Sequence, residues 1–204
     1  MCNFKSAIVI REPRNKGGFA LIHSSATDSH SVLIAANNLR DDDKLRFARV
    51  ELLPSEDWSD LKGYKLKIDD ERTPDWFDAD MQSAVTEKLL GLVKTMIVPE
   101  GVKYLLGGSW IVPKGRTVEV GPNTLIVMNS GTVTTNSGTV TRNYGTVTTN
   151  YNYGTVTHNS GTVTRNYGTG TVTHNSGTVT RNYGTVTHNS GTVTHNSGKI
   201  LKAK

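Results

Sequence analysis

Arginine, histidine and tyrosine side chains, which can bind anions, metal ions or aromatic rings, recur at a fixed spacing in the second half of the chain. They occupy the fifth and seventh positions of a seven-residue unit, Gly-Thr-Val-Thr-x-Asn-(Ser/Tyr). Arginine at the fifth position is always followed by Asn-Tyr, and histidine there is always followed by Asn-Ser. The candidate binding residues are Arg142, Arg165, Arg181, Tyr144, Tyr167, Tyr183, His158, His174, His188 and His195.

The arginine units raise the hypothesis of nucleic-acid binding, because guanidinium groups pair with phosphates and tyrosine rings stack on bases. The competing interpretation, which we favour, is that these side chains only cover the edge of a stack of strands. A protein that follows a nucleic-acid backbone usually carries more positive charge than this array. The lack of acidic residues in the array also argues against an acidic mimic of nucleic acid.

The histidine units raise a second hypothesis, a response to pH or to a divalent metal ion. Unperturbed imidazoles titrate at about pH 6.5, and imidazoles stacked about 5 Å apart repel one another when protonated. Histidines on a polar turn are more often solvated. We therefore predict no metal site and no cofactor.

The first half of the chain offers Cys2 as its one candidate nucleophile. Removal of the initiator methionine would make the amine of Cys2 available as a general base, but no oxyanion-hole signature follows it. His23 and His30 have no partner at the spacing of a metal site. The acidic runs 41–43 and 69–71 lie at the ends of predicted elements, where solvated turns are common. We expect no catalytic residues and hence a non-enzymatic protein.

The repeat itself predicts a β-solenoid. Each Thr-Val-Thr is a minimal strand with valine on one side and both threonines on the other, and the turn after it uses Asn and a Gly expected at positive φ. One inward valine per unit is too little for a free hairpin, so the units must stack to bury a shared core. Buried asparagines would form hydrogen-bonded ladders. The predicted core residues are Val133, Val140, Val147, Val156, Val163, Val172, Val179, Val186 and Val193.

The order of the variable residues favours two units per 14-residue coil, with a 21-residue triangular coil as the alternative. Stacking of like on like would place arginines with tyrosines along one edge and histidines with serines along the other. Two short insertions, near residues 151–153 and at 168–169, interrupt this alternation, as does a pair of histidine units at the end.

Residues 101–130 lack the repeat and are expected to form an N-terminal cap and irregular first coils, with Trp110 as the plug. The repeat array fills residues 131–204. Three lysines at its C-terminal end would discourage the addition of another strand. These are Lys199, Lys202 and Lys204.

Residues 1–100 predict a small α+β domain with the element order ββαββα. Apolar residues at three- and four-residue spacing after Asp78 predict the clearest helix of the chain. The runs 45–53 and 64–68 alternate and predict strands with one solvated face. The other elements are expected at 4–10, 19–23 and 32–36, two strands of a hairpin and a short helix.

The composition is that of a moderately basic chain. Its 204 residues include 23 Lys/Arg and 18 Asp/Glu, for a net charge of +5, and every acidic residue lies at or before Glu119. The positive excess therefore belongs to the second half, where it would suit an anionic partner. The single cysteine excludes an internal disulfide. No apolar run approaches the ~18 residues of a membrane span, and the first residues lack a signal-peptide core.

Two resemblances follow from these residues. Residues 1–9, Met-Cys-Asn-Phe-Lys-Ser-Ala-Ile-Val, with Thr-Pro-Asp-Trp-Phe at 73–77 and the helix after it, resemble the N-terminal module of uncharacterised bacterial and phage proteins in which short repeats often follow. The likeness covers residues 1–115 and implies a phage-associated role, in the cytoplasm of a bacterial host or in a virion, but it supplies no activity. The Thr-x-Thr spacing resembles the ice-binding face of insect antifreeze solenoids, although this array has no cysteines and brings Arg, His and Tyr close to the face.

These observations predict a structural or interaction protein that acts by multivalent binding or self-assembly through the repetitive surface of the solenoid. We expect a homo-oligomer or filament, or a complex with a protein partner, and no membrane. Nucleic-acid binding along an Arg/Tyr edge is the alternative function.

Overall fold

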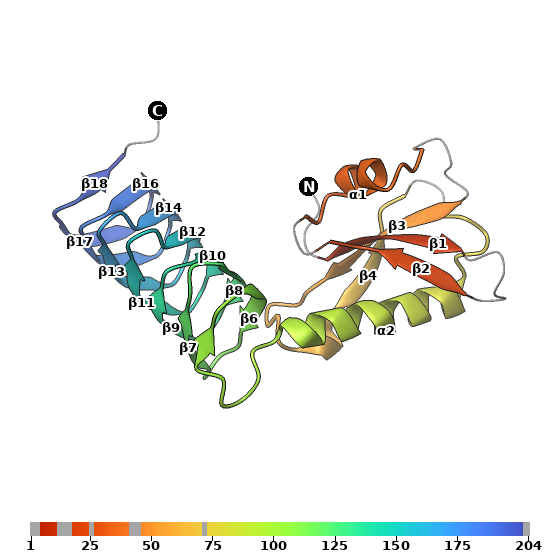
Figure 1. The fold of residues 1–204 in the computed structure, drawn as a ribbon, viewed down its shortest axis with the longest axis horizontal. Coiled ribbons are helices and arrows are strands. Elements are labelled where there is room, and N and C mark those ends of the chain that lie inside the picture. Colours follow the sequence, from red (N-terminus) through yellow and green to blue (C-terminus); the bar gives the residue numbers. More distant parts are fainter. Residues whose placement is uncertain (1–4, 12–17, 25–26, 41–45, 71–72, 202–204) are drawn as a thin grey trace. The chain divides into compact units, whose positions relative to one another are not determined.

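The computed structural model describes residues 5–11, 18–24, 27–40, 46–70 and 73–201. The chain divides into two compact units, Met1–Thr95 and Met96–Lys204 (Figure 1).

The first unit is a four-stranded antiparallel sheet with a helix on each face (Figure 1). Its strand order is β2-β1-β3-β4. Ala7, Ile8 and Val9 in β1 are all fully buried, which requires cover on both faces of the sheet. The elements are β1 (Ser6–Arg11), β2 (Phe19–Ile22), α1 (His30–Ala36), β3 (Phe47–Leu53), a short 3₁₀ helix (Leu61–Gly63), β4 (Lys65–Ile68) and α2 (Ala79–Met96).

Both helices of this unit follow from the sequence pattern. In α2 the side chains of Met81, Val85, Leu89 and Val93 are buried, as the spacing predicts, and the carboxylate of Asp78 caps the helix by accepting from the amide of Met81 at 2.9 Å. The prediction of one solvated face was wrong for β3, whose residues on both faces are buried or half-buried. It holds for β4, whose side chains alternate between exposed and half-buried.

The second unit is a parallel β-solenoid in which strands two apart in sequence pair with each other (Figure 1). The register is regular within the repeats and shifts in the first coils, between β6 and β8 and between β7 and β9. The odd sheet consists of β5 (Tyr104–Leu105), β7 (Thr117–Val120), β9 (Thr132–Asn136), β11 (Thr146–Tyr151), β13 (Thr162–Tyr167), β15 (Thr178–Asn182) and β17 (Thr192–Asn196). The even sheet consists of β6 (Gly108–Val112), β8 (Thr124–Asn129), β10 (Thr139–Asn143), β12 (Thr155–Asn159), β14 (Thr171–Asn175), β16 (Thr185–Asn189) and β18 (Lys199–Ile200). Two repeat units therefore form each coil, as predicted.

The valines of both sheets form one apolar core. Eight of the nine predicted core valines are 0 % exposed. The ninth, Val193, is only partly buried because it lies on β17, the end strand of its sheet in the described part of the chain. Val98, Leu105 and Ile126 extend the same core toward the N-terminal end.

Asparagines at the sixth position form the predicted ladders inside the solenoid. In the even sheet, Asn129 donates to Asn143 and Asn143 to Asn159, each at 2.7 Å. In the odd sheet, Asn150 donates to Asn166 and Asn166 to Asn182, each at 2.8 Å. These amides also donate to backbone carbonyl groups of the next coil, which satisfies polar groups at the turns.

The repeat glycines are required for a reason that the sequence prediction had wrong. Among described glycines only Gly101, Gly108, Gly115 and Gly168 have positive φ, and none of these begins a repeat unit. A Cβ on Gly145 would instead lie 2.1 Å from the carbonyl oxygen of Gly131 in the coil before it. Glycine begins each repeat unit because a Cβ at that position would collide with the backbone of a neighbouring coil.

Both insertions are accommodated at one corner of the solenoid. Asn152 and Gly168, one in each insertion, adopt left-handed φ values of 48° and 63°. They lie one above the other, since a Cβ on Gly168 would be 3.6 Å from the Cα of Asn152. The ladder step from Asn150 to Asn166 lengthens to 16 residues there without loss of register.

The two ends of the solenoid differ. At the first coil, Trp110 packs on the core and donates to the carbonyl of Gly107 at 2.6 Å. Val98, which the sequence prediction did not nominate, is also buried there, and its amide donates to Ile111 at 3.0 Å. At the last coil, Lys199 is exposed, and Lys202 and Lys204 lie outside the described residues.

Candidate functional site

The even sheet carries a row of histidines. His158 on β12 is in register with His174 on β14, and His174 with His188 on β16. The exposed imidazoles stack with centroids 4.9 and 4.8 Å apart and planes within 8°. The hydroxyl groups of Ser160 and Ser176 lie 3.3 Å apart beside this row. Histidines and serines thus share an edge, as the order of the repeats predicts.

The odd sheet carries the arginines and a row of tyrosines. Arg165 on β13 is in register with Arg181 on β15, and both side chains are exposed. The ring of Tyr151 stacks on that of Tyr167 with centroids 5.8 Å apart, and Tyr183 meets Tyr167 edge-on at 5.7 Å. The cations and the aromatic rings therefore lie on one surface.

Three of the predicted binding residues lie on the sheet opposite to their type. Arg142, with Tyr144 after it, belongs to the even sheet and is in register with His158. His195 belongs to the odd sheet, where it is in register with Arg181. Successive repeat units lie on the even and the odd sheet in turn, so the sheet of a unit depends on whether its place in the series is even or odd. The arginine and histidine units do not alternate strictly at either end of the array, so some of them lie on the other sheet.

Tyr151 is a member of the tyrosine row that the repeat pattern did not predict. It follows Thr149-Asn150 instead of Arg-Asn, and it lies where an insertion begins. Its position 16 residues before Tyr167, the length of one coil with an insertion, was the available signal, because residues one coil apart lie in register on the same sheet.

The array has no acidic side chain to neutralise its arginines. No Asp or Glu occurs after Glu119, so Arg165 and Arg181 have no carboxylate partner within the repeats. The odd sheet therefore presents uncompensated positive charge beside stacked aromatic rings.

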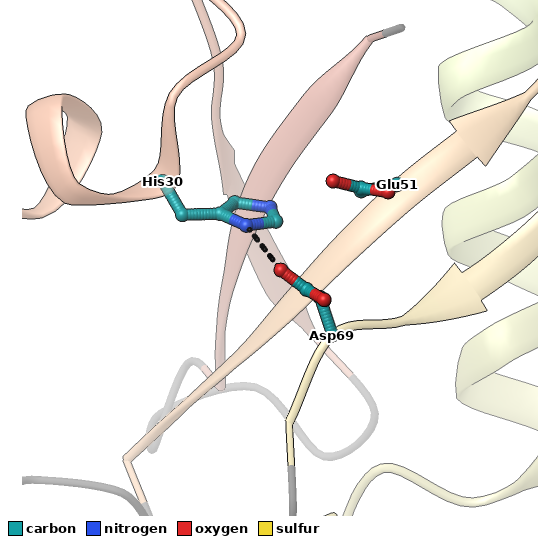
Figure 2. Close-up of side chains that lie close together, drawn as sticks. All are labelled: His30, Glu51 and Asp69. Carbon is teal, nitrogen blue, oxygen red and sulfur yellow. Dashed lines mark hydrogen bonds and ion pairs between the residues drawn. The ribbon is translucent and has the colours of Figure 1, made fainter. Parts of the chain in front are cut away.

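The first unit holds a separate cluster of ionisable side chains (Figure 2). Within the described part of the chain, His30, Glu51 and Asp69 are the one group of three His, Cys, Asp or Glu side chains close enough to share a metal ion, with ligand atoms within 4.8 Å of one another. His30 begins α1, Glu51 lies on β3 and Asp69 follows β4. No sequence spacing connects these three positions, and His30 was therefore predicted to have a structural role.

Lys67 sets the charge of this cluster from its exposed side. Burial would raise the pKa of Asp69, but the hydrogen bond and the charge of Lys67, with a smaller contribution from His30, lower it below the ordinary value.

The acidic run at residues 69–71 was predicted to be a solvated turn. That prediction was wrong for Asp70, whose carboxylate is buried and paired with Arg49.

Cys2, the candidate nucleophile, and the acidic run 41–43 lie outside the described residues. No helix in the described residues is long and apolar enough to cross a membrane. No family model, no curated protein and no solved structure matches this chain.

Proposed function

We propose that this protein is a non-enzymatic interaction protein whose solenoid binds a macromolecular partner, or further copies of itself, through many equivalent sites. The observation that carries the proposal is the stacking of identical side chains from coil to coil, as in the row His158–His174–His188. Each coil repeats the same surface at the strand spacing of about 4.8 Å. Equal sites on a rigid scaffold raise the effective concentration of every contact after the first.

The resemblance of residues 1–115 to bacterial and phage modules supports a phage-associated setting, in the host cytoplasm or in a virion. The first unit would then attach the solenoid to another component. Neither unit is proposed to catalyse a reaction.

Removal of one whole coil tests multivalency. Deletion of residues 177–190 removes one arginine unit and one histidine unit and joins Ser176 to Gly191, as it was joined to Gly177. If copies assemble through the repeated surface, sedimentation velocity should show weaker association for the shortened protein, and electron microscopy should show fewer or shorter assemblies. A full-length protein that stays monomeric at its highest soluble concentration excludes self-assembly. Equal association of both proteins would assign any assembly to a single site.

Nucleic-acid binding along the odd sheet is the second candidate function. Arg165 and Arg181 lie beside the stacked rings of Tyr167 and Tyr183 without a carboxylate in the array. Cations that follow a backbone and rings that stack on bases are the two elements of single-strand binding.

Fluorescence polarisation with a labelled oligothymidylate tests this candidate. Binding should weaken steeply with added salt and should weaken further in the double variant Arg165→Gln/Arg181→Gln. Arg142→Gln, on the even sheet, is the matched control and should have a smaller effect. Affinity that does not change with salt would exclude the candidate.

A further inference from the structure

The cluster on the α1 side of the first sheet has its histidine oriented for an additional ligand. The Nε2 atom of His30 lies 3.0 Å from the carbonyl oxygen of Val50. A carbonyl can only accept, so Nε2 carries the hydrogen, and in a neutral imidazole the lone pair is then on Nδ1. This Nδ1 atom lies 3.2 Å from Oδ2 of Asp69, which is also an acceptor (Figure 2). Two acceptors in contact need a cation between them, either a proton or a metal ion.

Glu51 provides an independent indication of a missing cation. Its side chain is 2 % exposed, and its Oε2 atom accepts no hydrogen bond from the described residues. Nζ of Lys67 forms an ion pair with this atom at 3.6 Å, a distance longer than a hydrogen bond. A buried carboxylate without such a partner is unfavourable unless an opposite charge compensates it.

We propose that His30, Glu51 and Asp69 bind a divalent transition-metal ion, a role separate from the function proposed for the solenoid. One imidazole nitrogen and two carboxylates are ligands suited to Mn²⁺, Fe²⁺ or Zn²⁺. The hydrogen bond from His30 to Val50 is the outer contact that typically orients a metal-binding histidine.

The geometry of the pair formed by His30 and Asp69 fits a shared ion. Two ligands about 2.1 Å from a metal are about 3.0 Å apart at a right angle and about 3.4 Å apart at the tetrahedral angle. The observed distance of 3.2 Å between Nδ1 and Oδ2 falls between these values. Glu51 completes the set by a shift of its carboxylate toward the other two groups.

Lys67 competes with the metal for the same carboxylates. Its ammonium group is within 3.3 Å of Asp69 and 3.6 Å of Glu51, and its side chain is 48 % exposed. Two carboxylates neutralise a divalent ion, so the ammonium can turn into solvent when the ion binds. Removal of this lysine charge should therefore strengthen metal binding.

Manganese titration of the full-length protein tests the site. Mn²⁺ prefers carboxylate ligands and binds imidazole weakly, so it distinguishes this cluster from the histidine row of the solenoid. We expect one Mn²⁺ per chain by electron paramagnetic resonance and calorimetry, and at least about tenfold weaker binding for His30→Gln and for Glu51→Gln. His158→Gln, in the solenoid row, is the matched control and should leave the affinity unchanged.

A variant that does not perturb the core keeps the test decisive. If His30→Gln fails to fold, Lys67→Gln replaces a half-exposed side chain and should bind Mn²⁺ more tightly than the unmodified protein. Three outcomes would overturn the proposal. These are absence of Mn²⁺ binding, an affinity unaffected by Lys67→Gln, and binding that is lost only on replacement of the solenoid histidines. The first outcome would assign the cation between His30 and Asp69 to a proton.

Discussion

The side-chain amide of Asn143 donates to the side-chain carbonyl of Asn159 at 2.7 Å, although the two residues are 16 positions apart in the chain. Asn159 in turn donates to Asn175 at the same distance. Each inner asparagine is therefore a donor to the next coil and an acceptor from the previous one. Bonds in such a series polarise one another, and the loss of one member affects both neighbours.

Asn159→Ala should lower the free energy of unfolding of the solenoid by about 2–4 kcal/mol, because it leaves buried polar groups of Asn143 and Asn175 without their partners. Urea unfolding followed by circular dichroism measures the change. Thr157→Ala, two residues earlier and pointing outward, is the control and should change stability by no more than about 0.5 kcal/mol. Similar losses for both variants would contradict the structural role of the ladder.

The position of a coil in the solenoid should decide how much its valine contributes to the free energy of unfolding. Val163 is 0 % exposed, whereas Val193 in the last coil is partly buried. Val163→Ala should cost about 2–3 kcal/mol through lost burial and the cavity left behind, and Val193→Ala should cost less than half of that. Equal costs, measured by the same urea titration, would mean that the last coil is covered in solution.

Two Gly→Ala substitutions should have opposite effects. Gly161→Ala would place a Cβ 2.1 Å from the carbonyl oxygen of Gly145, so the coils must separate and we expect loss of the folded solenoid at that point. Gly91→Ala in α2 meets nothing within 4 Å and should stabilise the first unit by about 1 kcal/mol through helix propensity. Hydrogen exchange, which reports on each unit separately, measures both effects. A tolerated Gly161→Ala would contradict the close approach of the coils.

Acid should destabilise the first unit partly through His23. Burial, followed by the charges of Lys5 and Lys88, lowers the pKa of His23 from its ordinary 6.5. The unfolded chain then binds this proton more readily than the folded one. The contribution of His23 to stability is complete above the ordinary pKa and is lost as pH falls from that value through the lowered one.

His23→Gln should therefore show a smaller loss of stability than the unmodified protein between about pH 7.5 and about pH 5. Because the side chain is largely exposed, solvent screening keeps the difference small. Parallel unfolding titrations at the two pH values measure it. Identical pH profiles would show that the environment of His23 is the same in both states.

The solenoid could be predicted from sequence because each unit places the same demand on its neighbours. Valine, asparagine and glycine recur at positions three, six and one. The structure turns the valine and asparagine side chains inward and packs the glycine backbone against a neighbouring coil. The buried positions of Val163 and Asn166 were predicted correctly, because only one environment suits each of these residues. It was predicted wrongly for Gly145, because a glycine at a turn can be required either by positive φ or by lack of space, and composition does not distinguish these causes.

The metal cluster could not be predicted, since it depends on how three elements pack. His30, Glu51 and Asp69 are separated by 21 and 18 residues, with no periodicity in common. Strand β3 brings Glu51 under α1 only because the sheet has the order β2-β1-β3-β4. The antiparallel pairing of Glu51 with Lys67 then places Asp69 beside it.

The rule that two units form one coil has a consequence for heredity. Near-identical repeats in a gene gain and lose units readily when it is copied. A change by an even number of units would alter the length of the solenoid and leave its faces intact. A change by an odd number would move every later unit to the opposite sheet. A row of histidines would then continue as a row of arginines, or a row of arginines as a row of histidines. The pairing of His195 with Arg181 on neighbouring strands is such a junction. Selection for an unbroken row would therefore act on whether the number of units is even or odd more than on how large that number is.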